Sequence, residues 1–216
     1  MSATEKGGAA DELWPLRPRP CHGELFSSWL VRIARCYGMP VRAFCREVWP
    51  RYEVWRGNID RQIEDEALQF LSRKTGVAHA ELFSMTLRAH ERFACPSPAD
   101  ASSLYFQFAN TGHAIRFCPR CLAERQPYFR LEWRLAFVTA CLRHRLPLLE
   151  RCDCCGARCL FGNVGVDRPL ASCYRCHRHL AGMGKDIDEG LAFQIELHLE
   201  FQQNMFNVLR NSQSLH

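Results

Sequence analysis

Four short Cys/His pairs between residues 118 and 176 constrain the fold of this 216-residue chain more than any other feature. In chain order the pairs are Cys118/Cys121, Cys141/His144, Cys152/Cys155 and Cys173/Cys176. Two intervening residues separate the members of each pair, and such a turn holds two ligands close enough to fill half of a tetrahedral zinc shell. The sequence therefore predicts two Zn²⁺ sites, one of three cysteines and a histidine and one of four cysteines.

Additional cysteines and histidines crowd the second predicted site. The choice of ligands stays open among Cys152, Cys154 and Cys155 and among Cys176, His177 and His179, with Cys159 close by. Buried free thiols or disulfides are the alternative, but they do not explain the two-residue spacing beside Pro119 and Gly156. Because all four positions of each site are filled, none is left for a reactive water, and the zinc is expected to be structural.

The length allows one domain or two small ones, and a hydrophobic share of 47% is ample for a packed core. Thirteen cysteines would indicate an oxidised, secreted protein if a signal peptide came first. Residues 1–16 lack the apolar core of such a peptide, and no later run is long enough to cross a bilayer. We therefore expect a reduced, cytoplasmic protein without membrane contact.

The basic residues are mostly arginine and are unevenly distributed. Of 28 basic residues 25 are Arg. Between residues 112 and 180 the sequence has twelve arginines and only five acidic residues, an excess of +7. Arginine contacts phosphate and carboxylate groups through two parallel hydrogen bonds, so an arginine-rich region suits binding to a DNA or RNA backbone or to an acidic protein surface. Alternatively, the abundance of arginine reflects a GC-rich genome, and the side chains are simply solvated. Candidate nucleic-acid or partner contacts are Arg17, Arg19, Arg42, Arg46, Arg120, Arg143 and Arg175.

The N-terminal half has a helical pattern of apolar residues. It predicts two helices joined by a glycine turn, twice: residues 24–37, Gly38 and 41–48, then residues 66–75, Gly76 and 79–87. Corresponding positions lie 38 residues apart, which suggests an internal duplication. Each unit is either a plain helical hairpin or a helix-turn-helix, whose second helix can enter a DNA major groove.

The whole chain is expected to be mainly α-helical, with small zinc-stabilised β hairpins. One hairpin is predicted from residues 104–108 and 113–117, and the apolar residues 128–138 are expected to form core around the metal. The last helix is apolar on more than one side, which indicates deep packing or a face for a second copy or a partner. The predicted divisions are a disordered lead at 1–12, a helix-turn-helix-like domain at 13–94, a linker at 95–103, a double zinc-binding region at 104–182 and a C-terminal helix at 183–216.

No catalytic motif is present. The sequence lacks a Walker loop, Gly-x-Ser-x-Gly, His-Glu-x-x-His and the His-x-Glu pattern of zinc deaminases. We interpret Asp60 and the acids at 64–66 as the solvated start of a helix. The remaining cysteines are interpreted as small hydrophobic residues: Cys21, Cys36, Cys45 and Cys95. The chain is therefore expected not to be an enzyme.

Two segments together resemble the TniQ family. The helix ELFSSWLVRIARCYGMP follows a Pro-Arg lead and is similar to the N-terminal motif of that family. The segments RFCPRCLAE and YFRLEWRLAFVTACLRHRLPLLERCDCCG are similar to its zinc region, including Arg130, Trp133 and the Cys141/His144 pair. The resemblance covers roughly residues 14 to 180, and the combination of motifs is far more specific than any single zinc pair.

The resemblance implies a non-enzymatic adaptor that selects the target site in DNA transposition. Members of the family link a target-recognition element to the AAA+ ATPase regulator of a separate transposase. The recogniser is in some systems a CRISPR effector complex with guide RNA, to which the protein binds, often as a dimer; other systems use a DNA-bound factor. Longer relatives read DNA themselves through additional C-terminal domains, so this chain is expected to be a short adaptor, cytoplasmic and nucleoid-associated during transposition.

Two other functions remain open from the residues themselves. An independent zinc-containing regulator would bind one DNA sequence through the paired helical units, with Arg42 and Arg46 on phosphate. A zinc-dependent nuclease or hydrolase is disfavoured, because both predicted ligand sets are closed.

Overall fold

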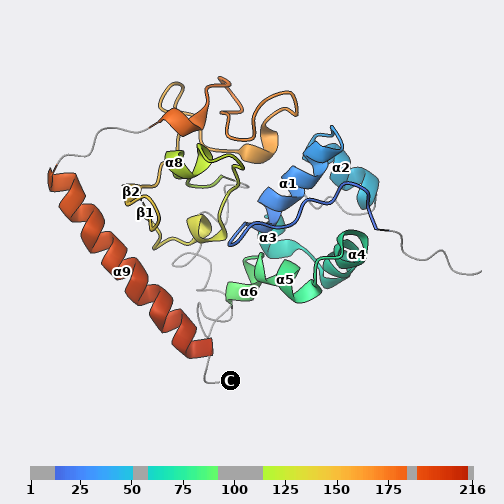
Figure 1. The fold of residues 1–216 in the computed structure, drawn as a ribbon, viewed down its shortest axis with the longest axis horizontal. Coiled ribbons are helices and arrows are strands. Elements are labelled where there is room, and N and C mark those ends of the chain that lie inside the picture. The colour runs from blue at the N-terminus through green and yellow to red at the C-terminus, as the bar shows by residue number, and fades with distance from the viewer. Residues whose placement is uncertain (1–12, 51–57, 92–113, 184–188, 214–216) are drawn as a thin grey trace, which may run out of the picture.

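The computed structural model describes residues 13–50, 58–91, 114–183 and 189–213. Within these residues the protein is mainly helical, with one small two-stranded sheet and two Cys/His clusters, which is the fold class that the sequence predicts. The predicted lead at 1–12, the linker at 95–103 and the strand at 104–108 lie outside the described residues. Figure 1 shows the N-terminal helices on one side, the Cys/His region in the middle and the last helix along the opposite side.

The described residues of the N-terminal part form six helices. They are α1 (Phe26–Cys36), α2 (Val41–Val48), α3 (Ile59–Gln62), α4 (Asp65–Thr75), α5 (His79–Ser84) and α6 (Arg88–Glu91). Gly38 and Gly76 follow the first helix of each predicted unit at φ of 65° and 69°, a left-handed backbone that glycine adopts without strain. Helix α5 ends at Ser84 rather than Leu87, because the chain turns there and the Leu87 N–H donates to the carbonyl of Asp60.

Helix α1 lies at the centre of the core, and every residue from 26 to 34 is buried. Its N-cap residue, Leu25, has no side-chain acceptor for the free N–H groups of the first turn. The carboxylate of Asp60 in α3 supplies one, accepting from the backbone N–H and the hydroxyl of Ser27 at 2.8 Å each. The interpretation of Asp60 as a solvated acid is therefore wrong, since the residue is 1% exposed.

The Cys/His region consists of short turns rather than long elements. It contains α8 (Pro119–Leu122), η1 (Leu131–Arg134), β1 (Ala140–Cys141), β2 (Leu146–Pro147), η2 (Phe161–Asn163) and η3 (Leu180–Gly182). Strands β1 and β2 pair antiparallel and carry the Cys141/His144 turn between them. The predicted second strand at 113–117 is not formed in its described part: only Phe117 makes a bridge, and its partner is Leu149.

The helical part and the Cys/His region share one hydrophobic core. The Leu25 N–H donates to the carbonyl of Phe129, and the Leu131 N–H donates to that of Gly23. The ring of Phe129 is fully buried and stacks on Phe161 with centroids 4.3 Å apart. The aromatic residues after the first Cys/His pair therefore pack as core, joining α1 to both halves of the region.

Helix α9 (Glu189–Gln213) contacts the rest of the described chain through β1 and its surroundings. Ile195 and Leu199 pack on Ala140, and the fully buried Gln202 side chain bonds to the backbone of β1. A second row of apolar side chains is more than half exposed: Phe193, Leu197, Phe201 and Val208. No helix among the described residues has both the length and the apolar character needed to cross a membrane.

Candidate metal centres

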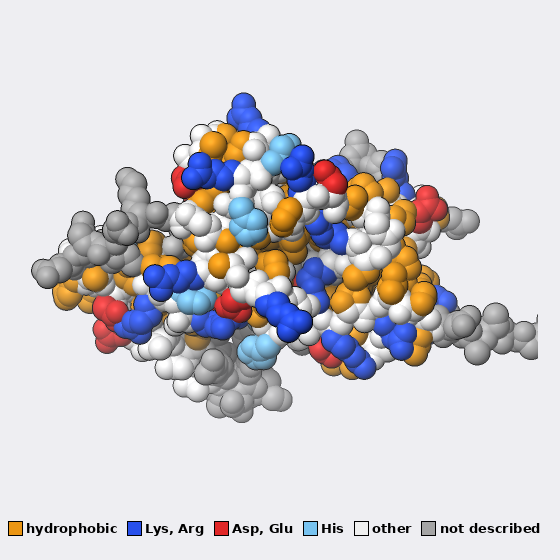
Figure 2. Space-filling model, turned by 45° about the horizontal axis from the view of Figure 1, so that its top comes forward, with side chains coloured by type: hydrophobic (Ala, Val, Ile, Leu, Met, Phe, Trp, Pro, Cys, Tyr) orange, Lys and Arg blue, Asp and Glu red, His pale blue; other side chains and the backbone are white. Residues whose placement is uncertain are grey.

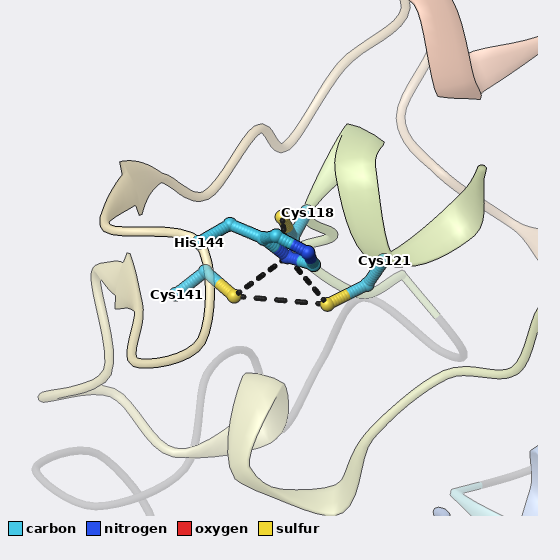
Figure 3. A group of neighbouring side chains, drawn as sticks. All are labelled: Cys118, Cys121, Cys141 and His144. Atoms are coloured by element: carbon cyan, nitrogen blue, oxygen red, sulfur yellow. Dashed lines mark hydrogen bonds between the residues drawn. The ribbon is translucent and has the colours of Figure 1, made fainter. Parts of the chain in front are cut away.

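The first cluster brings together the first two predicted pairs. Cys118 is the N-cap residue of α8, and Cys121 lies within that helix. Cys141 and His144 come from the end of β1 and the turn that follows it (Figure 3). The Nδ1 atom of His144 lies 3.5, 3.3 and 3.7 Å from the sulfurs of Cys118, Cys121 and Cys141. The imidazole therefore faces the three thiols through Nδ1.

The second cluster joins the last two pairs. The Cys152 and Cys176 sulfurs are 3.5 Å apart, and those of Cys155 and Cys173 are 3.6 Å apart. In each cluster the four donor atoms lie within 4.8 Å of one another. Of the residues that crowd this site, Cys159 is buried outside the cluster. Three others are exposed and also lie outside it: Cys154, His177 and His179.

The donor spacing fits a tetrahedral zinc ion. Zn–S bonds of about 2.3 Å at tetrahedral angles place two sulfurs about 3.8 Å apart. The shortest sulfur pairs in the two clusters, 3.5 to 3.7 Å, are close to this value. Thiolate and imidazole donors without a carboxylate are typical of zinc rather than of magnesium or calcium. Both clusters are therefore compatible with a closed, structural zinc site.

A repeated backbone turn positions the ligands. In three pairs, the residue after the second ligand donates its N–H to the carbonyl of the first ligand, at 2.8 to 3.0 Å: Arg145, Gly156 and His177. All three residues have φ between 51° and 69°. This left-handed backbone is ordinary for Gly156, whereas it strains the two residues that carry a Cβ. The same local geometry thus serves both clusters.

The proximity of the thiols shifts their pKa values. The pKa of Cys121 lies far above its usual range because hydrogen bonds with Cys118 and Cys141, and then burial, favour the protonated thiol. In the second cluster a backbone hydrogen bond from Ala157 lowers the pKa of Cys155 to about 7. Neighbouring thiolates repel one another, so a full set of them requires a positive ion at the centre.

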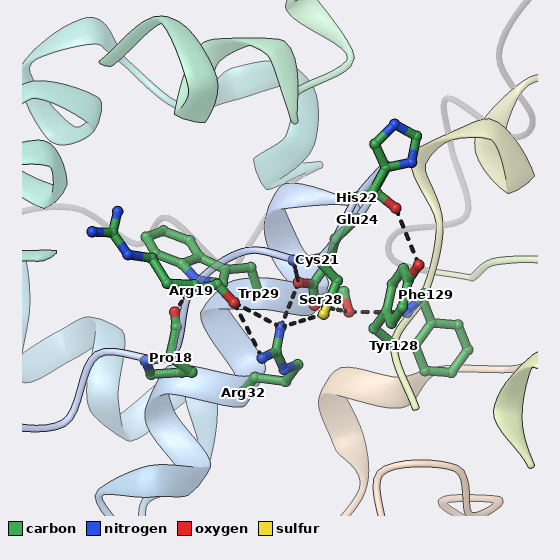
Figure 4. A network of polar contacts seen from close by, with 10 residues as sticks. All are labelled: Pro18, Arg19, Cys21, His22, Glu24, Ser28, Trp29, Arg32, Tyr128 and Phe129. Carbon is green, nitrogen blue, oxygen red and sulfur yellow. Dashed lines mark hydrogen bonds and ion pairs between the residues drawn. The ribbon is translucent and has the colours of Figure 1, made fainter. Parts of the chain in front are cut away.

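A buried polar network fixes the start of α1 (Figure 4). Glu24 is fully buried, and its carboxylate pairs with Arg32 at 2.5 Å and accepts the Ser28 hydroxyl at 2.9 Å. Burial raises the pKa of Glu24, although Arg32 acts in the opposite direction. The Ser28 hydroxyl also accepts the N–H of Phe129. Ser28 and Arg32 lie on one face of α1, and Glu24, just before the helix, continues the same four-residue spacing. The sequence contains this signal in the ELFSSWLVR motif, but its spacing was not used to predict the network.

The candidate arginines divide into two groups. Arg17 and Arg19 donate to the carbonyls of Trp14 and Gly76, and Arg143 pairs with Glu124. The other four are exposed, and the described residues supply no hydrogen-bond or ion-pair partner for them: Arg42, Arg46, Arg120 and Arg175. Figure 2 shows basic side chains spread across this face of the molecule rather than gathered in one patch.

Metal binding changes the charge of the Arg-rich region. Seven thiolates and two Zn²⁺ ions together contribute −3. The excess of +7 between residues 112 and 180 therefore falls to +4 once both sites are filled. With both sites filled, part of the arginine excess would balance the clusters, and the charge left for a nucleic acid would be smaller than the composition indicates.

The fold and the clusters define a helical protein whose core continues into a region suited to two structural zinc ions. The sequence model of the TniQ family matches residues 15–148, which is more than half of the chain, and the chain belongs to that family. The family is associated with target selection in transposition and is generally non-catalytic. The match includes the first cluster and ends before the second cluster and α9. No curated protein matches the chain.

Proposed function

We propose that this protein is a non-enzymatic adaptor that links a target-recognition complex to the AAA+ ATPase regulator of a transposase. The observation that carries the proposal is the family match over residues 15–148, which spans the helical units and the first cluster. The shared core supports the proposal, because Phe129 and Phe161 join the helical units and both clusters into one packed body. Such a body can present separate binding surfaces to two partners. The recogniser is a CRISPR effector with guide RNA or a DNA-bound factor, and the site of action is the cytoplasm, at the nucleoid.

Zinc has a structural role in this proposal. All four positions of each cluster come from the chain itself, so two structural Zn²⁺ ions would fix the short turns that carry the exposed Arg120 and Arg175. These two residues, with Arg42 and Arg46, are exposed arginines without a hydrogen-bond or ion-pair partner among the described residues, and a DNA or RNA backbone would be contacted through them. The expected contacts are few, which suits an adaptor that is positioned mainly by its protein partners.

A homodimer is part of the same proposal. The exposed row on α9 offers Phe193, Leu197 and Phe201 on the side away from β1, four residues apart along one helix face. A second copy would bury these side chains, and sedimentation velocity of the zinc-loaded protein measures whether it does. Leu197→Ser with Phe201→Ser is expected to shift a dimer to monomer, whereas a monomeric wild-type protein would remove this part of the proposal.

The experiment that tests the adaptor function is capture of the AAA+ ATPase by the zinc-loaded protein. Capture is measured with ATP and nonspecific DNA, and again without each. Cys141→Ser, which breaks the first cluster, is expected to abolish capture and targeted insertion, while Cys154→Ser, an exposed thiol outside the clusters, leaves both unchanged. Capture that is equally strong for Cys141→Ser contradicts a role for the first cluster.

The independent DNA-binding regulator is the other outcome of the same experiment. It predicts no capture of the ATPase and tight, salt-dependent binding to one DNA sequence. Replacing Arg42 or Arg46 by Ala would then weaken binding to that sequence. No specific observation in the fold favours this function, since the exposed face of α2 carries Glu47 beside these arginines and no asparagine or glutamine.

A further inference from the structure

The ring of His144 has two nitrogen atoms, and the structure separates their roles. Nδ1 faces the three thiols of the first cluster. Nε2 points to the outside of the cluster and lies 3.9 Å from Oε1 of Glu124. A histidine that binds zinc through Nδ1 carries its proton on Nε2, so this N–H requires an acceptor on the outer side.

Glu124 is held in place to supply that acceptor. It follows α8, and its backbone N–H donates to the carbonyl of the ligand Cys121 at 3.3 Å. Arg143 lies 2.8 Å from Oε1 but donates its hydrogen bond to Oε2, at 3.1 Å. Oε1 is buried and has no hydrogen-bond partner among the described residues. This oxygen is thus near both the guanidinium of Arg143 and the outer nitrogen of the histidine in the cluster.

We propose that Glu124 is a positioning residue for the first zinc site. It accepts the Nε2 proton of His144, directly or through one water, and thereby holds the tautomer that leaves Nδ1 free for the metal. A distance of 3.9 Å is longer than a direct hydrogen bond, and a small side-chain rotation or a single water closes it. Carboxylate partners of this kind fix the orientation of a ligand histidine and raise its basicity.

Arg143, which the sequence predicts as a nucleic-acid or partner contact, also has a structural role in this proposal. Its guanidinium lies close to both carboxylate oxygens of Glu124, 2.8 Å from Oε1 and 3.1 Å from Oε2, and Oε1 also faces Nε2 of His144. It therefore helps to orient the Glu124 side chain beside His144. Glu124 and Arg143 come from opposite halves of the first site, beside Cys121 and His144, so their ion pair also links these halves. The inference concerns metal binding and is independent of which partners the chain bridges.

The test is zinc affinity, measured by competition with a chelator for each of the two zinc equivalents. Glu124→Ala is expected to weaken the first site about 10- to 100-fold, the usual effect of losing such a partner. Glu124→Gln keeps an acceptor oxygen without the charge, and its affinity should lie between that of Glu124→Ala and that of the wild type. Glu196→Gln is the matched control, because Glu196 pairs with Arg145 next to His144, whereas the acidic side chain beside the imidazole is that of Glu124.

The second zinc equivalent serves as an internal control. A general folding defect weakens both sites, whereas loss of a positioning residue weakens only the first. The inference is overturned if Glu124→Ala binds both equivalents within threefold of the wild type, or weakens the two equally. Weakening by Glu196→Gln to the same extent as by Glu124→Ala also overturns it, because the effect would then follow from surface charge.

Discussion

Replacing Phe161 by Ala tests whether the second cluster belongs to the same folded body as α1. Phe161 is 1% exposed, lies between the pairs of the second cluster and stacks on Phe129 with centroids 4.3 Å apart. Truncation of a buried Phe costs about 3 to 5 kcal/mol, of which the stacked pair accounts for about 0.5 to 1.5 kcal/mol. In a chain of this size the melting temperature falls by about 2 to 4 °C per kcal/mol, so a drop of about 6 to 20 °C is expected.

The assay is thermal unfolding of the zinc-loaded protein, followed by far-ultraviolet circular dichroism for the helices and by a zinc indicator for metal release. Both signals are expected to move together, because the helices and the cluster share one core. Leu16→Ala is the control, since that side chain is 46% exposed and lies outside the proposed dimer surface, so its loss should change stability by about 0.5 kcal/mol. An early metal-release step with unchanged helix melting would refute the idea of one cooperative body.

Three further outcomes follow. Gln202→Ala should destabilise the attachment of α9 by about 2 to 4 kcal/mol, because the backbone N–H groups of Thr139 and Ala140 lose the buried amide oxygen to which they donate. Gln203→Ala, on the exposed side of α9, is the control and should change little. Equal protease sensitivity of α9 in both variants would contradict this. His177→Gly should keep both zinc equivalents and stabilise the chain by up to about 1 kcal/mol, because glycine adopts the left-handed backbone at φ 63° without strain. His179→Gly is the control: its φ is −69°, and the change removes the imidazole that accepts a backbone N–H, so it should lower stability. Loss of a zinc equivalent in His177→Gly would show that the residue is a ligand. Zinc affinity should fall as the pH drops from 7.5 to 5, because protons compete with the metal for the thiols. Calorimetry in buffers of different ionisation enthalpy measures the number of protons released on zinc binding. Equal affinity at both pH values would speak against thiolate ligands.

The features that the sequence predicts well are those with a short, fixed spacing. Ligand pairs separated by two residues recur because one turn geometry serves each of them, and the structure brings together the same four-residue sets. The two helical units can also be predicted from the sequence, since Gly38 and Gly76 occupy backbone positions that favour glycine. The identity of the metal and the partners of the protein stay predictions.

The features that sequence reasoning missed depend on contacts between distant segments. Nothing in the local sequence of Asp60 shows that it caps α1, because the cap is formed only when α3 packs against Ser27. Similarly, Phe117 pairs with Leu149 because formation of the first cluster brings these two segments side by side. Local spacing predicts turns and helices, whereas the pairing of remote segments depends on the packed core.

The contact of Arg35 with the loop of the second cluster has a consequence for metal capture. Its guanidinium donates to the carbonyls of Gly165, Val166 and Arg168, inside the segment that separates Cys155 from Cys173. Closing a flexible loop to form a metal site costs conformational entropy, and ordering the loop in advance removes part of that cost. The folded helix α1 therefore raises the effective concentration of one half-site around the other. The affinity of the second site for zinc is in this way linked to the folding of a helix more than a hundred residues earlier in the chain.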